Sequence, residues 1–168
     1  NYYLSLMVVD SLLQDIKYAD LTNIKIQEAK GRFEIVNDSP IKIIDGAHNY
    51  EGVEILLRNY ENKYGHLNTD LFVGFKKGKD INNIFNLIIG KTNYNLHLIE
   101  DDTFFDQEIT KEIGYLLDKH GKNYKISSLE QFNRNKNPSI LLGSLYLIGE
   151  YKKRNIKWKR FLWLSQMV

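Results

Sequence analysis

Short strand-like runs alternate with helical segments from about residue 33 to residue 151, and this alternation limits the fold more than any other feature. The expected strands are 33–36, 41–44, 71–75, 96–99, 124–126 and 140–142. The expected helices are 53–60, 80–89, 106–119 and 144–151. This order predicts an α/β domain with a mostly parallel sheet and helices on both faces. Turn-forming residues at 37–40 indicate that the first two strands form an antiparallel hairpin at the sheet edge.

The two ends of the chain carry weaker patterns. Apolar spacing predicts two more helices, at 2–16 and about 22–30, while residues 156–164 have aromatic and aliphatic side chains in strand-like order. A length of 168 residues is typical of one domain, which we take as 1–168. Because the sequence begins with Asn and enters a helix at once, we expect another domain of a larger protein to precede it.

The composition excludes several classes of function. Lys and Arg number 23 against 21 Asp and Glu, and a net charge of +2 does not indicate a partner nucleic acid, so the basic stretch 152–160 is interpreted as a solvated helix end. No apolar run approaches the roughly 20 residues that span a bilayer, and no leader is recognisable, so we expect no membrane contact and a cytoplasmic location. Cysteine, metal-site spacings and Walker-type or dinucleotide-binding glycine motifs are missing from the sequence.

The turn Asp45-Gly46-Ala47-His48-Asn49 follows the second expected strand, at the edge of an α/β sheet where ligands bind. The Asp45 carboxylate suits the paired hydroxyls of a ribose, and the His48 imidazole suits a base edge or a phosphate. The alternative is structural, because Asp45 and Asn49 can also satisfy loose backbone N–H groups, with Asn49 capping the next helix. The residues alone leave both interpretations open.

Two further positions are candidates for binding an anion. Ser144 follows Gly143 at the start of a predicted helix, where free N–H groups and a partial positive charge suit a carboxylate or phosphate. The alternative for Ser144 is a plain helix N-cap. Arg32 lies next to Gly31, and its planar guanidinium can contact an anion or stack on a purine, although a lone surface arginine is usually solvated.

Three stretches of the sequence together carry a resemblance to a known family. They are Gly31-Arg32-Phe33-Glu34-Ile35-Val36, Asp45-Gly46-Ala47-His48-Asn49 and Gly143-Ser144-Leu145-Tyr146-Leu147-Ile148-Gly149-Glu150. The chain resembles, over nearly its whole length, the C-terminal domain of folylpolyglutamate synthase/dihydrofolate synthase, in the Mur ligase superfamily of ATP-dependent amide-forming ligases. The resemblance implies a Rossmann-like mixed sheet flanked by helices, in agreement with the alternation of strands and helices.

The resemblance also implies an activity and roles for residues. The family forms an acyl phosphate from ATP and a folate or dihydropteroate carboxylate, which the amine of L-glutamate then attacks. Arg32, Asp45 and His48 are implied to contact ATP, with Asp45 near the ribose. Asn1 is implied as a further nucleotide contact, and Ser144 lies where the glutamate is expected. The phosphate cradle and the Mg²⁺ ligands belong to the family's upstream ATPase domain, so we expect the isolated chain to fold without catalysing.

Two other functions stay open at this point. A non-catalytic module that binds a nucleotide or docks a protein can carry the same motifs. A glutamate-adding Mur-type ligase of peptidoglycan synthesis differs only in its acceptor, although Gly46 and the stretch 143–150 favour the folate branch. The number of glutamates added and the oligomeric state are not predicted by the sequence.

Overall fold

The computed structural model describes residues 29–100 and 107–165, and it describes side-chain surroundings as far as residue 155. The predicted helix at 2–16 and nearly all of the one at 22–30 lie outside these residues. The candidate nucleotide contact Asn1 lies outside them too, so its role stays a prediction.

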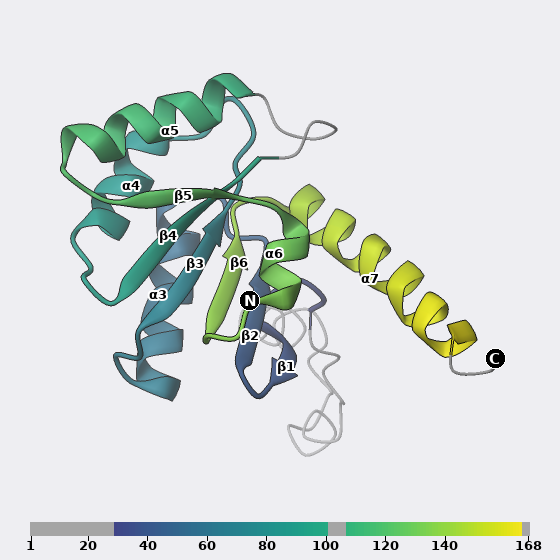
Figure 1. The fold of residues 1–168 in the computed structure, drawn as a ribbon. Helices are drawn as coiled ribbons and strands as arrows, with labels where there is room; N and C mark the ends of the chain where they lie inside the picture. Colours follow the sequence, from purple (N-terminus) through teal and green to yellow (C-terminus); the bar gives the residue numbers. More distant parts are fainter. Residues whose placement is uncertain (1–28, 101–106, 166–168) are drawn as a thin grey trace, which may run out of the picture.

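Six strands form one sheet in the order β1-β2-β6-β3-β4-β5 (Figure 1). They are β1 (Glu34–Asp38), β2 (Ile41–Asp45), β3 (Thr69–Val73), β4 (Tyr94–Ile99), β5 (Tyr124–Ser127) and β6 (Ser139–Leu142). Only β1 and β2 pair in antiparallel fashion, and every other neighbouring pair is parallel. The predicted mostly parallel sheet with an antiparallel edge hairpin is therefore confirmed.

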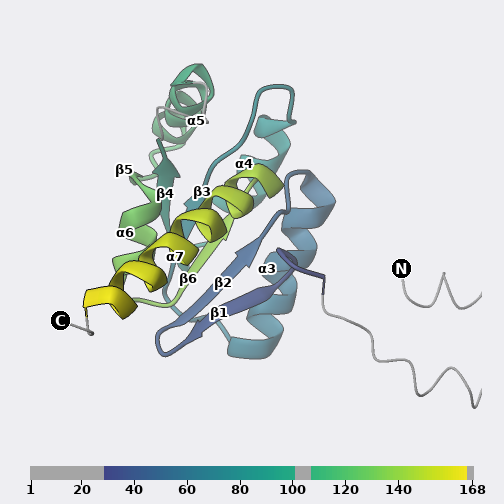
Figure 2. The same cartoon turned by 90° about the vertical axis from the view of Figure 1, so that its right-hand side faces the viewer.

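Helices cover both faces of the sheet, as predicted. They are α3 (Tyr50–Tyr64), α4 (Ile81–Ile89), α5 (Gln107–Lys119), α6 (Leu129–Arg134) and α7 (Leu145–Ser165). One apolar core joins the sheet to α3, α4 and α5, and a second core joins the opposite face to α6 and α7. Figure 2 shows the two layers, with α7 in front of the sheet and α3 behind it.

The predicted helical stripe and the predicted Asn49 cap account for α3, and α4 begins with a cap that was not predicted. The stripe of α3 consists of its four buried residues, Val53, Leu56, Leu57 and Tyr60. The Asn49 side chain caps the start of α3 by accepting the Gly52 N–H, and Asp80 caps α4 in the same way through Asn83. Apolar spacing and an N-cap residue together fix where these helices begin and which side faces the sheet.

The structure corrects the prediction at two places. The strand-like interpretation of 156–164 is wrong, because the backbone of α7 continues as helix to Ser165. No Gly or Pro occurs between residues 150 and 165 to end that helix, and the lysines and arginines there are good helix formers. The helix α6 was not predicted, although Ser128 and Gln131 form a reciprocal capping box at its start.

The position of β6 determines where the candidate site lies. Strand β6 is inserted between β2 and β3, so that Leu142 pairs with Asp45 on one side and with Val73 on the other. The helix after β2 lies on one face of the sheet and the helix after β6 lies on the other. In α/β sheets, ligands bind at the carboxyl ends of two neighbouring parallel strands whose following helices lie on opposite faces of the sheet.

Candidate functional site

Three turns that are distant in the sequence meet at the carboxyl ends of β2 and β6. The turn before β1 contacts the turn after β2 through a 2.8 Å hydrogen bond from the Gly46 N–H to the Gly31 carbonyl. The first turn of α7 packs on the same glycine, because a Cβ on Gly46 would lie 2.2 Å from Leu145 Cδ2. Gly46 therefore has no room for a side chain unless Leu145 moves, whereas Gly31 has φ 74°, a backbone conformation that favours glycine.

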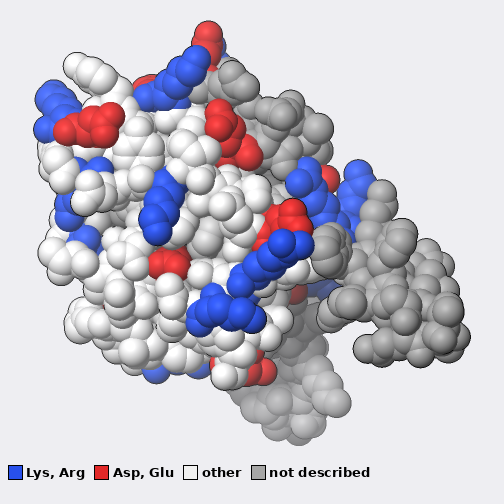
Figure 3. All heavy atoms as spheres, viewed as in Figure 1, with Lys and Arg blue, Asp and Glu red and all other residues white. Residues whose placement is uncertain are grey.

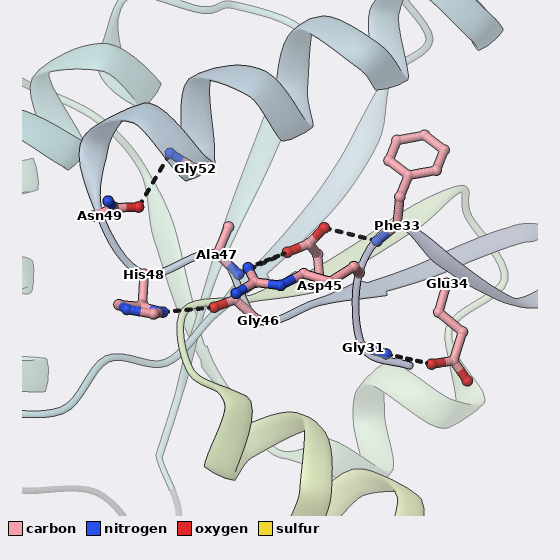
Figure 4. A network of polar contacts seen from close by, with 10 residues as sticks. Gly31, Phe33, Glu34, Asp45, Gly46, Ala47, His48, Asn49 and Gly52 are labelled. Carbon is pink, nitrogen blue, oxygen red and sulfur yellow. Dashed lines mark hydrogen bonds and ion pairs between the residues drawn. The ribbon is translucent and has the colours of Figure 1, made fainter. Parts of the chain in front are cut away.

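Asp45 holds two of these turns together through its carboxylate. Its Oδ2 accepts the Phe33 N–H at 2.8 Å, and its Oδ1 accepts the Ala47 N–H at 2.7 Å (Figure 4). Asp45 is only 7% exposed. The structural role considered for Asp45 is thus present, and each carboxylate oxygen keeps a further lone pair for a ligand hydroxyl.

Arg32 lies beside Asp45, as the expected shared site requires. Its Nη1 is 3.7 Å from Asp45 Oδ1, and its side chain is 49% exposed. About half of the side-chain surface of Arg32 therefore stays open to solvent beside the carboxylate. A planar cation held in this way can contact an anion or stack on an aromatic ring.

The ring of His48 is oriented by its own turn. Its Nδ1 lies 2.8 Å from the Gly46 carbonyl oxygen (Figure 4). Because a carbonyl only accepts hydrogen bonds, Nδ1 is the donor in this contact, which leaves Nε2 as the ring nitrogen available to a ligand. The side chain of His48 is half-buried.

Ser144 caps α7, which is the structural alternative considered for it. Its Oγ accepts the Tyr146 N–H at 3.2 Å, and the residue is 6% exposed. The hydroxyl hydrogen has no acceptor among the described residues. The preceding Gly143 has φ 121°, and a Cβ there would lie 2.4 Å from the Gly74 carbonyl oxygen. The turn into α7 therefore depends on a glycine at position 143.

One pair at this edge was missed by sequence reasoning. Lys76, in the loop after β3, places its Nζ 3.7 Å from the centre of the Tyr146 ring, and Tyr146 is 65% exposed. Cations attract the faces of aromatic rings. The sequence shows only that Lys76 follows a strand. The strand order, in which β3 lies beside β6, is what brings Lys76 next to the start of α7.

The described residues do not fit a divalent metal. Within 29–100 and 107–165, no group of three or more His, Asp or Glu side chains could hold a metal ion. The described residues therefore provide no site of three such ligands for the Mg²⁺ that the resemblance implies.

Two further observations concern the surface charge and the helices of the described residues. On the face seen in Figure 3, Lys and Arg are scattered among Asp, Glu and uncharged groups rather than gathered in one field. None of the helices in the described residues combines the length and hydropathy needed to cross a membrane.

Comparison with known proteins shows a shared fold. No protein-family model and no curated protein matches the chain. Solved structures do match, among them a folylpolyglutamate synthetase from Helicobacter pylori at 20% identity and a TM-score of 0.65, covering 90% of this chain and 38% of that one. A folylpolyglutamate synthase from Mycobacterium tuberculosis complexed with ADP and AMPPCP is 12% identical, with a TM-score of 0.66 and coverages of 91% and 38%.

A third match extends the same pattern. The bifunctional folylpolyglutamate synthase/dihydrofolate synthase from Yersinia pestis, complexed with AMPPNP and an Mn ion, is 17% identical with a TM-score of 0.54. It covers 79% of this chain and 35% of that one. The chain thus spans little more than a third of these proteins and has the α/β fold of one part of them. The resemblance stated from the motifs and the likeness in fold point to the same group of proteins.

Proposed function

We propose that the chain is the C-terminal domain of an ATP-dependent ligase that adds L-glutamate to a folate or dihydropteroate carboxylate. The observation that carries this proposal is the distance of 3.7 Å between Arg32 Nη1 and Asp45 Oδ1. This pair lies at the carboxyl end of β2, where the helices after β2 and β6 leave for opposite faces of the sheet. The same fold occurs in solved enzymes that are described as bound to adenine nucleotides.

Each site residue has a role that its geometry supports. Arg32 uses its exposed guanidinium to contact a phosphate or to stack on the adenine. Asp45 accepts ribose hydroxyls through the lone pairs that its backbone partners leave open. His48 presents Nε2 to the same nucleotide. The unused hydroxyl hydrogen of Ser144 and the start of α7 receive a carboxylate of the incoming glutamate, which is favourable at a helix N-terminus.

The proposed reaction has two steps. A carboxylate oxygen of the acceptor attacks the γ-phosphorus of ATP, and ADP leaves. The glutamate amine then attacks the acyl carbon, phosphate leaves with the bonding electrons, and the amine loses a proton to give the amide. This chain contributes orientation and exclusion of water, which lower a barrier by several kcal/mol when the geometry is held tightly. Closure against the upstream ATPase domain assembles the site, so the isolated chain does not turn over.

Steady-state kinetics of the full-length protein test the nucleotide site. Arg32→Ala should raise the KM for ATP about tenfold, the effect of losing one charge-assisted contact. Arg58→Ala removes the same charge from the exposed side of α3 and should leave the KM unchanged. Equal kinetics for both variants would favour the non-catalytic module over the ligase.

The acceptor is tested separately. Dihydropteroate, tetrahydrofolate and a UDP-linked peptidoglycan precursor should be offered to the full-length protein together with ATP and L-glutamate. We expect turnover with at least one of the two pterin acceptors and none with the UDP-linked precursor. Turnover with the precursor alone would assign the Mur-type reaction instead.

A further inference from the structure

A groove separate from the three turns opens between β1, the loop from α6 to β6, and α7. Helix α7 crosses this face of the sheet (Figure 2). Its volume is about 860 Å³. Ligand pockets for small organic molecules fall in this size range. Its charged lining consists of four lysines, Lys30, Lys42, Lys136 and Lys152, and one acid, Glu34.

Lys42 is the unusual member of this set because it is buried. The residue is 6% exposed, and its Nζ donates to the carbonyls of Phe132 at 3.1 Å and Asn133 at 2.5 Å. These carbonyls lie at the C-terminal end of α6, where the helix dipole favours a cation. An ammonium group has three N–H donors, so one hydrogen of Lys42 has no hydrogen-bond acceptor among the described residues, although Nζ also lies 5.7 Å from the centre of the Phe132 ring.

The positive charge at this end of the groove is not neutralised by the protein's described residues. No ion pair among them involves Lys42 or Lys136. Burial, and to a smaller extent the neighbouring charge of Lys136, lower the pKa of Lys42. At the other end of the groove, Lys152 Nζ lies 2.5 Å from Glu34 Oε2, so the two opposite charges of that pair neutralise each other.

We propose that this groove binds a multiply charged oxyanion, a polycarboxylate or a polyphosphate, seated at the Lys42–Lys136 end. The third hydrogen of Lys42 donates to the anion from a fixed, partly dehydrated position, where charge-assisted hydrogen bonds are strong. Exposed Lys136 supplies the second cation. Lys30 extends the positive lining toward the other end of the groove, so a ligand with several separated charges fits better than a single ion.

Isothermal titration calorimetry on the chain, with tripolyphosphate and with citrate as probes, tests this site. Lys136→Gln should weaken binding of the preferred probe about tenfold, since one charge-assisted contact is lost. The matched control is Lys111→Gln, which removes an equal charge from an exposed position of α5 and should bind as the wild type does. Preference for citrate assigns a carboxylate ligand, and preference for tripolyphosphate assigns a phosphate ligand.

A second variant separates this groove from the candidate nucleotide site. In the Arg32→Ala background, in which the candidate nucleotide site has lost its cation, Lys136→Gln should still weaken probe binding about tenfold, because Lys136 lines the groove and Arg32 does not. Lys42→Met should abolish binding, with circular dichroism confirming that the variant is folded; Lys136→Gln carries the test if it is not. The proposal is overturned if neither probe binds, if Lys136→Gln and Lys111→Gln bind alike, or if Lys136→Gln has no effect in the Arg32→Ala background. The proposed ligase function does not enter this argument, and its failure would leave the groove's test intact.

Discussion

The carboxylate of Asp45 accepts a 2.8 Å hydrogen bond from the backbone N–H of Phe33, twelve residues earlier in the chain. Phe33 has φ 44°, a left-handed backbone conformation that costs a non-glycine residue about 1 kcal/mol or more. The bond therefore holds a strained turn in place, and with it the neighbouring Arg32. One acid serves both the local backbone and the proposed ligand, so the two alternatives considered from the sequence are compatible.

Asp45→Asn tests this dual role. The amide group keeps one acceptor oxygen, but its NH₂ end must face the N–H of either Phe33 or Ala47. We expect the free energy of unfolding to fall by about 2 kcal/mol, the cost of leaving a buried backbone donor unpaired. Urea denaturation measures this loss. Asp118→Asn, at an exposed position of α5, is the control and should stay within about 0.5 kcal/mol of the wild type. Equal stability of the two variants would contradict the argument.

Gly143→Ala should be among the most damaging substitutions in the chain. A Cβ at this position meets the backbone oxygen of Gly74 at 2.4 Å, and φ is 121°. The expected loss is about 3 kcal/mol or more, from strain and overpacking together. Gly149→Ala is the matched control, because nothing lies within 4 Å of a Cβ there. In the helix interior it should stabilise by about 0.5–1 kcal/mol, so the two melting temperatures should move in opposite directions.

A buried carboxylate at the amino end of β3 is surrounded by amides. Asp70 accepts from the side chains of Asn95 at 2.8 Å, Asn135 at 2.8 Å and Asn137 at 3.0 Å. Burial acts to raise the pKa of Asp70, but these hydrogen bonds outweigh it and hold the pKa below its usual value of 3.8. Asp70 therefore joins β3 to β4 and to the loop before β6 in its ionised form.

Asp70→Ala should destabilise the chain by about 3 kcal/mol at pH 7, because three amides lose their acceptor. A carboxyl whose folded-state pKa is lowered contributes its full stabilisation above pH 3.8, and this is lost as the pH falls through the folded-state pKa. The stability difference between wild type and variant should thus shrink as the pH drops below 3.8. Urea denaturation at pH 7 and near pH 3 checks it, and a difference that is independent of pH would refute the role of the charge.

We predict that the buried hydroxyl of Tyr94 makes the folded protein less stable at alkaline pH. Burial and the adjacent Glu61 carboxylate, to which its hydroxyl donates at 3.1 Å, raise the pKa of Tyr94 far above its usual 10.0. Below pH 10.0 this stabilisation is complete, and above it the unfolded chain loses a proton that the folded chain keeps. Stability should then fall by about 1.4 kcal/mol per pH unit for this group.

Tyr94→Phe removes that group and should flatten the decline between about pH 10 and 11 relative to the wild type. At neutral pH it should cost about 1 kcal/mol for the lost hydrogen bond to Glu61. Tyr115→Phe, at a position that is 76% exposed, should reproduce the wild-type pH profile. Guanidinium denaturation over this range measures all three proteins, and identical profiles for both variants would exclude Tyr94 as the cause.

The parts of the fold that depend on local sequence were predictable. The stripe and caps of α3 and α4 and the turn at 37–40 each act within a few residues, so their signals are written in consecutive positions. The six-residue α6 is too short to show a helical period, and only its capping pair marks it. The strand prediction for 156–164 failed for a related reason. Aromatic side chains favour strands by propensity, whereas the backbone of α7 continues as helix from the residues before them.

The candidate site likewise combines residues that stand out in short stretches of sequence with contacts that only the fold creates. The motif residues Arg32, Asp45 and His48 were identified from short stretches, and the structure places Arg32 next to Asp45. The contact between Lys76 and Tyr146 joins positions that only the order of strands brings together. The buried state of Lys42 was equally hidden, because it depends on α6 and its loop closing over the start of β2.

The insertion of β6 between β2 and β3 has a consequence for how this protein is made. Strands that follow each other in the chain, β2 and β3, never touch, so the hairpin and the β3–β4–β5 group remain two separate halves until Leu142 has been synthesised. A nascent chain emerging from the ribosome must therefore carry both unfinished edges, and their exposed backbone groups, until β6, the last of the described strands, arrives.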